Sequence, residues 1–397
     1  MRAIPSGSKR VPEALRRGRL VSRLHSSRPE RLRAANFAWL RFLAALAVVA
    51  GHYMPKTAGG SGASWLEEHD SGAMAVTLFF TLSGLTLSQA RPVVVEGTPV
   101  HALRFLWRRA LKLLPLYWGS LALTAVGACL LGHLDLSELL VSAAALQAWL
   151  PGFAMTLNKP AWFMSALFAF YALCPLLAVL GGRTTPTRFL VGSFLFWLFT
   201  TASVVAVRAA YGPETGTALH DLLLYSPLAH ASTFVFAYSA GSFASNCSSR
   251  MGHTVSSNMM WSLALAAVFV ILQVSRDRIS AVVGHEIHYA SGFLTPLFIV
   301  QLLLMGLWSG SWTRFLRLRP VQFLGEISFT IYMLQHPLYA AFARLGAGWL
   351  DSRTVGGFAA FALALCVISA LVQRWIMAPL VRRLWASGAG PMPSGSS

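Results

Sequence analysis

Charge is scarce in this sequence. Only 12% of its 397 residues are Asp, Glu, Lys or Arg, whereas a soluble globular protein carries about 25%. Acidic residues are the rarest charged group, at 14 against 32 Lys and Arg, while 55% of the chain is hydrophobic. This composition excludes an ordinary soluble domain, and it predicts a membrane protein whose main partner is the lipid bilayer.

Cysteine is also scarce, and metal-ligand patterns are weak. The four cysteines are scattered as Cys129, Cys174, Cys247 and Cys366, at spacings that match neither a disulfide framework nor a zinc site. The sequence HEIH holds His285, Glu286 and His288, but two histidines three positions apart with one Glu are a weak metal pattern. We therefore expect small buried cysteines, a solvated loop at HEIH and no bound metal.

Long apolar runs, in contrast, are abundant. Runs of about 17–25 apolar residues are long enough to cross a bilayer as helices. They fall at residues 36–55, 72–90, 113–131, 162–180, 188–208, 220–244, 258–274, 291–309, 325–345 and 356–377. The sequence therefore predicts an all-α fold class, a polytopic membrane protein with about ten transmembrane helices.

The basic residues fix the predicted orientation of these spans. If the N-terminus is cytoplasmic, most of the 32 Lys and Arg residues lie in cytoplasmic segments. The positive-inside rule favours this arrangement, which also places the C-terminus in the cytoplasm. Because the basic residues lie between apolar runs in alternate loops, we expect a multi-pass protein of the plasma (inner) membrane and no nucleic-acid partner.

The chain divides into three predicted parts. Residues 1–35 form a basic cytoplasmic tail that we expect to be disordered, residues 36–380 form the transmembrane domain, and residues 381–397 form a short cytoplasmic tail. The apolar segment 137–151 is too short to span comfortably. We interpret it as a re-entrant or interfacial piece on the outer side.

The first span holds two costly polar groups, Arg41 and His52. Eleven helical positions turn through about 1,100°, close to three full turns, so the two side chains share one face about 16 Å apart. Ionisable residues at membrane depth are usually functional. There are structural alternatives to a functional role: the Arg41 side chain reaches back to the membrane interface, and His52 is an ordinary helix-end residue.

A basic helix precedes the third span. The segment HALRFLWRRALKLLP places Arg104, Arg108, Arg109 and Lys112 at helical spacing among apolar residues. Such a pattern is typical of a helix at a membrane surface. Its charges suit an anionic ligand in the cytoplasm, although positive-inside topology alone also explains each of them, as it does Arg314, Arg317 and Arg319.

Four sequence motifs occur in order along the chain: LRFLAALAVVAGH, LFFTLSGLTLSQ, RRALK before PLYW, and GEISFTIYMLQHPLY. The ordered set resembles the acyltransferase 3 family of integral membrane acyltransferases, of the carbohydrate O-acetyltransferase type. Each motif alone is weak, but their order within a chain of about ten spans is specific. The resemblance covers roughly residues 36–380, which makes this part an acyltransferase 3-like transmembrane domain.

The resemblance implies roles for particular residues. His52 corresponds to the catalytic base, and Arg41 to a residue that binds or positions the acyl donor. Arg109 and Lys112 occupy the RxxR positions near which the family binds acyl-CoA, with Arg104 and Arg108 beside them. His336 matches the last motif, where it would hold the acceptor or donate to the carbonyl; a hydrogen-bonded packing histidine is the alternative. The remaining motif positions are Ser83, Trp162, Ser165, Ser328 and Tyr332.

The sequence departs from the family pattern at several of these positions. Lys112 replaces the second Arg, which keeps the charge but loses bidentate phosphate geometry. The family motif WSLSVEEQFY stands here as WFMSALFAFY, with Leu167 and Phe168 in place of both acids. Asp221, at the mouth of the sixth predicted span, is one candidate to replace the missing carboxylate.

The resemblance implies a membrane-bound O-acyltransferase. It would move an acyl group, expected to be acetyl, from cytoplasmic acyl-CoA to a hydroxyl of a glycan or another envelope or secreted acceptor. His is the usual base for such a step at neutral pH. Acyl-CoA is then a co-substrate and no bound cofactor is expected. We picture its pantetheine arm running from the basic cluster past Arg41 to His52, along one wall of one channel.

Two alternative functions stay open. A membrane transporter or flippase of a glycan or lipid would use Arg41 and His52 in its pathway, and a need for acyl-CoA distinguishes it from an acyltransferase. A catalytically inactive relative that acts as an assembly component would be consistent with the loss of the two acids at Leu167 and Phe168.

Overall fold

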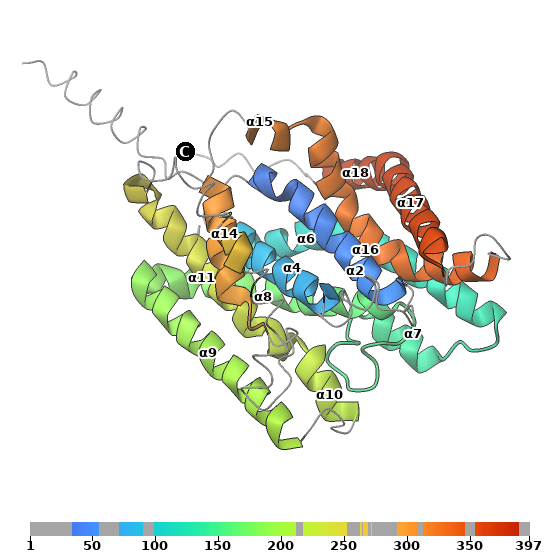
Figure 1. The fold of residues 1–397 in the computed structure, drawn as a ribbon, viewed down its shortest axis with the longest axis horizontal. Helices are drawn as coiled ribbons and strands as arrows, with labels where there is room; N and C mark the ends of the chain where they lie inside the picture. Colours follow the sequence, from blue (N-terminus) through green and yellow to red (C-terminus); the bar gives the residue numbers. More distant parts are fainter. Residues whose placement is uncertain are drawn as a thin grey trace, which may run out of the picture.

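The computed structural model describes most of the chain as helix (Figure 1). The described residues are 34–54, 71–89, 99–211, 217–251, 292–307, 313–345 and 354–388, with a few positions between 263 and 271. These residues contain no strand, which confirms the all-α fold class. The basic tail up to residue 33, most of the predicted span 258–274 and the HEIH loop lie outside the described residues.

The long helices coincide with predicted spans. They are α2 (Ala38–Tyr53), α4 (Ser71–Ser88), α6 (Pro99–Leu130), α8 (Trp162–Arg183), α9 (Pro186–Tyr211), α11 (Pro227–Met251), α14 (Thr295–Leu307), α16 (Arg319–Leu345) and α17 (Val355–Leu371). Shorter elements join or extend them: η1 (Ala34–Phe37), α7 (Leu136–Ala143), η2 (Lys159–Ala161), α10 (Thr217–Leu224), α15 (Thr313–Leu316), the π-helix η6 (Val372–Met377) and α18 (Ala378–Gly388).

Five helical segments of the described chain are long and apolar enough to cross a membrane. They are Ala35–Tyr53, Val100–Leu130, Lys159–Arg183, Pro186–Val207 and Val355–Trp385, and two shorter apolar helices, Gly72–Ser88 and Thr295–Gly306, accompany them. These helices agree with a membrane protein. The number of ten spans and the cytoplasmic position of both termini remain predictions.

The basic segment and the third span form one continuous helix. The 32 residues of α6 run from Pro99 to Leu130 without a break at Pro115, as the sequence predicted. The four cations of the basic segment therefore lie on the same helix as the apolar residues that follow. This continuity fixes their position relative to the rest of the helical body.

The predicted span 220–244 is instead divided into α10 and α11. Proline is well suited to the first position of a helix, because it has no N–H to leave unpaired, and Pro227 starts α11. Ser226 Oγ accepts from the Leu228 N–H at 3.2 Å and caps the new helix. Segment 137–151, in contrast, does not form a long helix, since α7 ends at Ala143.

Six helices lie side by side in the order α9, α11, α4, α2, α16 and α17 (Figure 1). Helix α8 packs against α4, α6, α9 and α11, and α6 also contacts α16. The outermost helices expose apolar stripes at helical spacing: Leu195 and Phe199 on α9, and Leu363, Val367 and Leu371 on α17. Contiguous exposed apolar stripes of this kind suit contact with lipid.

Glycines in two of the motifs permit close helix crossings. A Cβ at Gly84 would lie 2.6 Å from the Phe234 carbonyl oxygen of α11, and one at Gly325 would lie 2.7 Å from Cα of Ala38 on α2. Small residues at such crossings let the helix backbones approach closely, which is how membrane helices gain packing energy. The LSG and GEIS motifs therefore have a packing role in addition to any chemical one.

We predict that Gly84→Val destabilises the protein, because the larger side chain would collide with the α11 backbone. Overpacking of this kind costs about 1–3 kcal/mol. The measurement is thermal unfolding in detergent, with Gly127→Val on α6 as the matched control, since a Cβ at Gly127 meets no atom within 4 Å. Equal melting temperatures for the two variants would contradict the proposed crossing.

Candidate functional site

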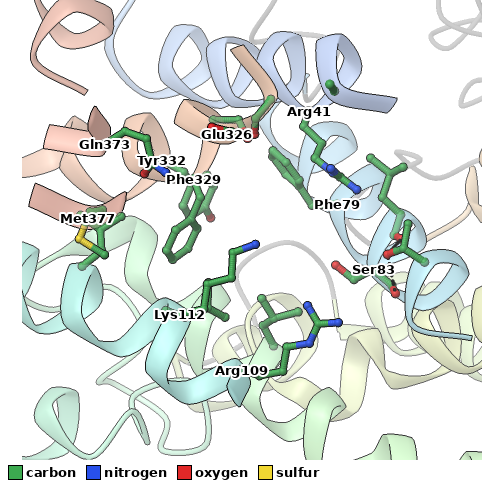
Figure 2. Close-up of a pocket in the computed structure, with 18 of the residues that line it drawn as sticks. Arg41, Phe79, Ser83, Arg109, Lys112, Glu326, Phe329, Tyr332, Gln373 and Met377 are labelled. Carbon is green, nitrogen blue, oxygen red and sulfur yellow. Dashed lines mark hydrogen bonds between the residues drawn. The ribbon is translucent and has the colours of Figure 1, made fainter. Parts of the chain in front are cut away.

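A cavity of about 670 Å³ lies inside the helical body, between α2, α4, α6, α8, α16 and the C-terminal segment. Arg41 enters it from α2, and Arg109 and Lys112 enter from α6 on the opposite wall (Figure 2). The three side chains come from positions 41, 109 and 112, so only the tertiary fold brings them together. Three of the basic residues predicted to bind the donor thus share one cavity.

These three cations face one another with little compensation from acids. Arg41 interacts electrostatically with Arg109, and Lys112 interacts with both arginines. Glu326 is the single carboxylate among the described residues that line the cavity, and it attracts Lys112. Converging positive charges in an apolar enclosure favour the binding of an anion.

Aromatic rings hold Arg109 in place. Its guanidinium lies 5.5 Å from the ring centre of Phe105 and 5.8 Å from that of Tyr171. Cation–π contacts of this kind orient an Arg side chain without neutralising its charge. Tyr171 is one of the residues of the WFMSALFAFY segment that keeps the family type, so this part of the motif serves to support the arginine.

The missing carboxylate pair has no direct replacement at its own position. Leu167 lines the cavity and is buried, so an apolar side chain stands where the first acid was expected. Asp221 accepts a hydrogen bond from the Gly152 N–H at 2.6 Å and orders the loop after α7 instead. The carboxylate of the cavity belongs to Glu326, which the sequence contains in the GEIS motif but which we did not single out.

Three other motif residues also line the cavity, namely Ser83, Ser328 and Tyr332. Ser328 Oγ donates to the Gly325 carbonyl at 2.7 Å. The Tyr332 ring packs against Phe79 and Phe163, with centre distances of 6.0 and 5.1 Å. Tyr332 is buried among these aromatic rings, so packing holds its ring in the cavity wall.

Two motif residues, Trp162 and Ser165, lie outside the cavity lining. Trp162 stacks on His230 with ring centres 5.5 Å apart, and His230 in turn bonds through Nε2 to the Leu224 carbonyl at 2.8 Å. Ser165 is buried, and its hydroxyl has no hydrogen-bond partner among the described residues. Neither residue lines the cavity, so both serve its support.

The two histidines of interest lie near each other, at the end of α2 and in the middle of α16. The Tyr53 hydroxyl and His336 Nδ1 form a hydrogen bond of 3.1 Å, and the Tyr53 ring stacks on Tyr339 at 4.2 Å. His52 is exposed and interacts electrostatically with His336. The pairing of α2 with α16 therefore builds a second polar region around His52.

Lys159, a residue that the sequence did not single out, adds a positive charge to this histidine region. It interacts electrostatically with both His52 and His336. Its neighbour Asn158 is buried and donates to Ser120 Oγ at 3.0 Å and to the Met333 carbonyl at 3.2 Å. The loop before α8 is thus fastened to α6 and α16, and Lys159 is held beside the histidines.

The cavity and the histidine region are neighbours that meet at Tyr332. Arg41 lines the cavity, whereas His52 and His336 do not. Tyr332 takes part in both regions, because it lines the cavity and interacts electrostatically with Tyr53. Arg41 and His52 both lie on α2, and the continuous channel wall that we expected between them stays a prediction.

The other predicted basic residues lie elsewhere on the surface. Arg104 and Arg108 line a second groove, which shares Arg109 and Lys112 with the cavity. Arg314, Arg317 and Arg319 are exposed and line neither space.

Comparison with known proteins identifies the family. The family model described as "Acyltransferase domain" (Acyl_transf_3) matches residues 35–373, a range that contains the cavity residues of α2, α4, α6, α8 and α16. No curated protein and no solved structure matches the chain.

Proposed function

The chain belongs to the acyltransferase 3 family, and from this premise we propose that it transfers an acyl group from acyl-CoA to a hydroxyl group. Acetyl is the expected acyl group, and a glycan or another envelope or secreted molecule is the expected acceptor. The observation that carries the proposal is the convergence of Arg41, Arg109 and Lys112 in one cavity. An acyltransferase needs such a site for a negatively charged donor.

Donor binding follows from the chemistry of the cavity. Coenzyme A carries phosphates at one end and an uncharged pantetheine arm that ends in the thioester. The cations on α6 suit the phosphates, with Lys112 acting as a point charge where a second Arg would bind in bidentate fashion. A volume of about 670 Å³ falls within the range of about 300–1,000 Å³ that small-molecule pockets span.

His52 acts as the general base in this proposal. It removes the proton from the acceptor hydroxyl as the oxygen attacks the thioester carbonyl carbon, the C–S bond breaks, and the coenzyme A thiolate leaves and takes up a proton. Hydrogen bonds with the Tyr53 hydroxyl at Nδ1 and with the Leu157 backbone orient His336. To hold the acceptor or the developing oxyanion, His336 would exchange the Leu157 contact for the substrate oxygen. A two-step route through an acylated enzyme remains the alternative.

The aromatic packing around Tyr332 sets a requirement on this mechanism. In this proposal the acyl end of the donor passes Tyr332 on its way to His52, because Tyr332 lines the cavity and interacts with Tyr53, the neighbour of His52. A rotamer change of one aromatic side chain on donor binding would meet that requirement.

The position of His52 at the end of α2 supports acceptor modification on the outer face of the plasma (inner) membrane. The same residues would suit a transporter or flippase of a glycan or lipid, with Arg41 and His52 in its pathway. Glu326 still supplies a carboxylate to the cavity, where it attracts Lys112, and this weighs against a catalytically inactive relative.

We predict that His52→Ala abolishes acyl transfer while leaving the fold intact, because His52 is exposed at a helix end. The measurement is thiol release and label transfer from labelled acetyl-CoA in inside-out membrane vesicles loaded with a crude envelope extract. His133→Ala is the matched control, since His133 is exposed in the turn after α6. If His52→Ala and the wild type transfer label equally, His52 is not the base.

A second prediction concerns Arg41. Arg41→Gln removes one of the three cavity charges, and we expect the KM for acetyl-CoA to rise by at least about tenfold, in line with the loss of a charge-assisted contact. Arg41→Lys keeps the charge and should recover part of that loss. Arg344→Gln is the control, because Arg344 is exposed at the end of α16 and donates to the Ala340 carbonyl of its own helix. An unchanged KM for acetyl-CoA in Arg41→Gln would contradict the proposal that the donor binds in this cavity.

A further inference from the structure

A second groove, of about 570 Å³, lies between α6 and the C-terminal helix α18. Helix α6 contributes His101, Arg104 and Arg108 to its lining, and α18 contributes Arg382 and Trp385. The groove joins the donor cavity, because Arg109 and Lys112 line both spaces. A ligand can therefore extend from one space into the other.

Trp385 and Arg382 present a flat ring and a positive charge side by side. They stand three positions apart on α18, so they share one face of that helix. The Arg108 guanidinium lies 5.9 Å from the centre of the Trp385 ring, yet 49% of the tryptophan remains exposed. Arg382 Nε donates to the Ala378 carbonyl at 3.1 Å, which directs the side chain along its helix.

Helix α18 lies beyond the part of the chain that the family assignment covers. The family match ends at residue 373, whereas α18 begins at Ala378. The sequence predicts only a short cytoplasmic tail from residue 381. Its contact with α6 nevertheless turns the basic face of α6 from an open surface into a two-walled groove.

We propose that this groove binds the adenosine nucleotide of the acyl-CoA donor, with Trp385 and Arg382 as binding residues. The adenine ring would stack on Trp385, and the phosphates would bind to Arg382 and to the cations of α6. Bases stack on aromatic side chains, and guanidinium groups bind phosphates in bidentate fashion. This inference rests on the proposed function, because it assumes that acyl-CoA is the donor.

The junction of the two spaces favours a nucleotide with an attached arm. With the nucleotide in the groove, the pantetheine arm passes Arg109 and Lys112 and enters the cavity that contains Arg41. The arginines would also attract a lipid phosphate. A lipid headgroup, however, has no aromatic ring to stack on Trp385 and no arm that would extend into the cavity. The combination of ring, cations and adjoining cavity therefore points to coenzyme A.

The test compares two donors in four variants. Acetyl-CoA carries the nucleotide, whereas S-acetylpantetheine has the same reactive end without it. For Trp385→Ala and Arg382→Ala we expect the KM for acetyl-CoA to rise roughly tenfold, which corresponds to one lost stacking or charged contact. The KM for S-acetylpantetheine should stay at the wild-type value, because that donor does not reach α18.

Two neighbouring residues provide matched controls. Trp375 is 69% exposed and Arg383 is exposed, and neither lines the groove. Trp375→Ala and Arg383→Ala should therefore keep the wild-type KM for both donors. If Trp385→Ala raises the KM equally for both donors, or for neither, the nucleotide assignment is overturned.

Equilibrium binding of labelled adenosine 3′,5′-bisphosphate separates this inference from the proposed function. We expect the purified wild type to bind it and Trp385→Ala to bind roughly tenfold more weakly. Equal binding by the two proteins would overturn the groove assignment. If the variant binds more weakly but the wild type transfers no acyl group, the groove assignment is supported. Only the proposed acyltransferase mechanism is then contradicted.

Discussion

The placement of three positive charges inside an apolar helical body is the constraint on which this structure depends. Arg41, Arg109 and Lys112 repel one another. Arg41 and Arg109 are half-buried whereas Lys112 is exposed, so the repulsion is costly chiefly for the two arginines, which lie in surroundings of lower dielectric constant than water. One carboxylate, Glu326, faces them from α16. A multiply charged anion relieves the remaining repulsion, so ligand binding and the stability of the site are coupled.

The helix crossings place these charges. Because Gly325 lets α16 approach the backbone of α2 at Ala38, the same pair of helices brings Glu326 to the cavity and, three turns further on, His336 to Tyr53. The donor side and the histidine side are thus opposite ends of one tightly packed helix pair. A change at the crossing would move both ends together.

The sequence predicted the fold class and much of the cavity, because both depend on local patterns. Apolar runs located the long helices, and the ordered motifs identified Arg41, Arg109, Lys112, Ser83, Ser328 and Tyr332, all of which line the cavity. The break at Pro227 was visible as a proline, but the apolar residues on both sides concealed it. Glu326 and Lys159 could not be assigned, since their roles arise from which helices and loops become neighbours. The same holds for Trp385, whose partner Arg108 is far away in the chain.

The central claim is that the acyl end of the donor lies beside Tyr332, between the three cations and the histidines. The most direct measurement is photo-crosslinking with an acyl-CoA that carries a diazirine in its acyl chain, followed by identification of the labelled peptides. The account predicts adducts on the segments that contain Phe79, Phe163 and Tyr332, and competition by unmodified acetyl-CoA. Adducts confined to α9 or α14, or labelling that acetyl-CoA does not reduce, would contradict it.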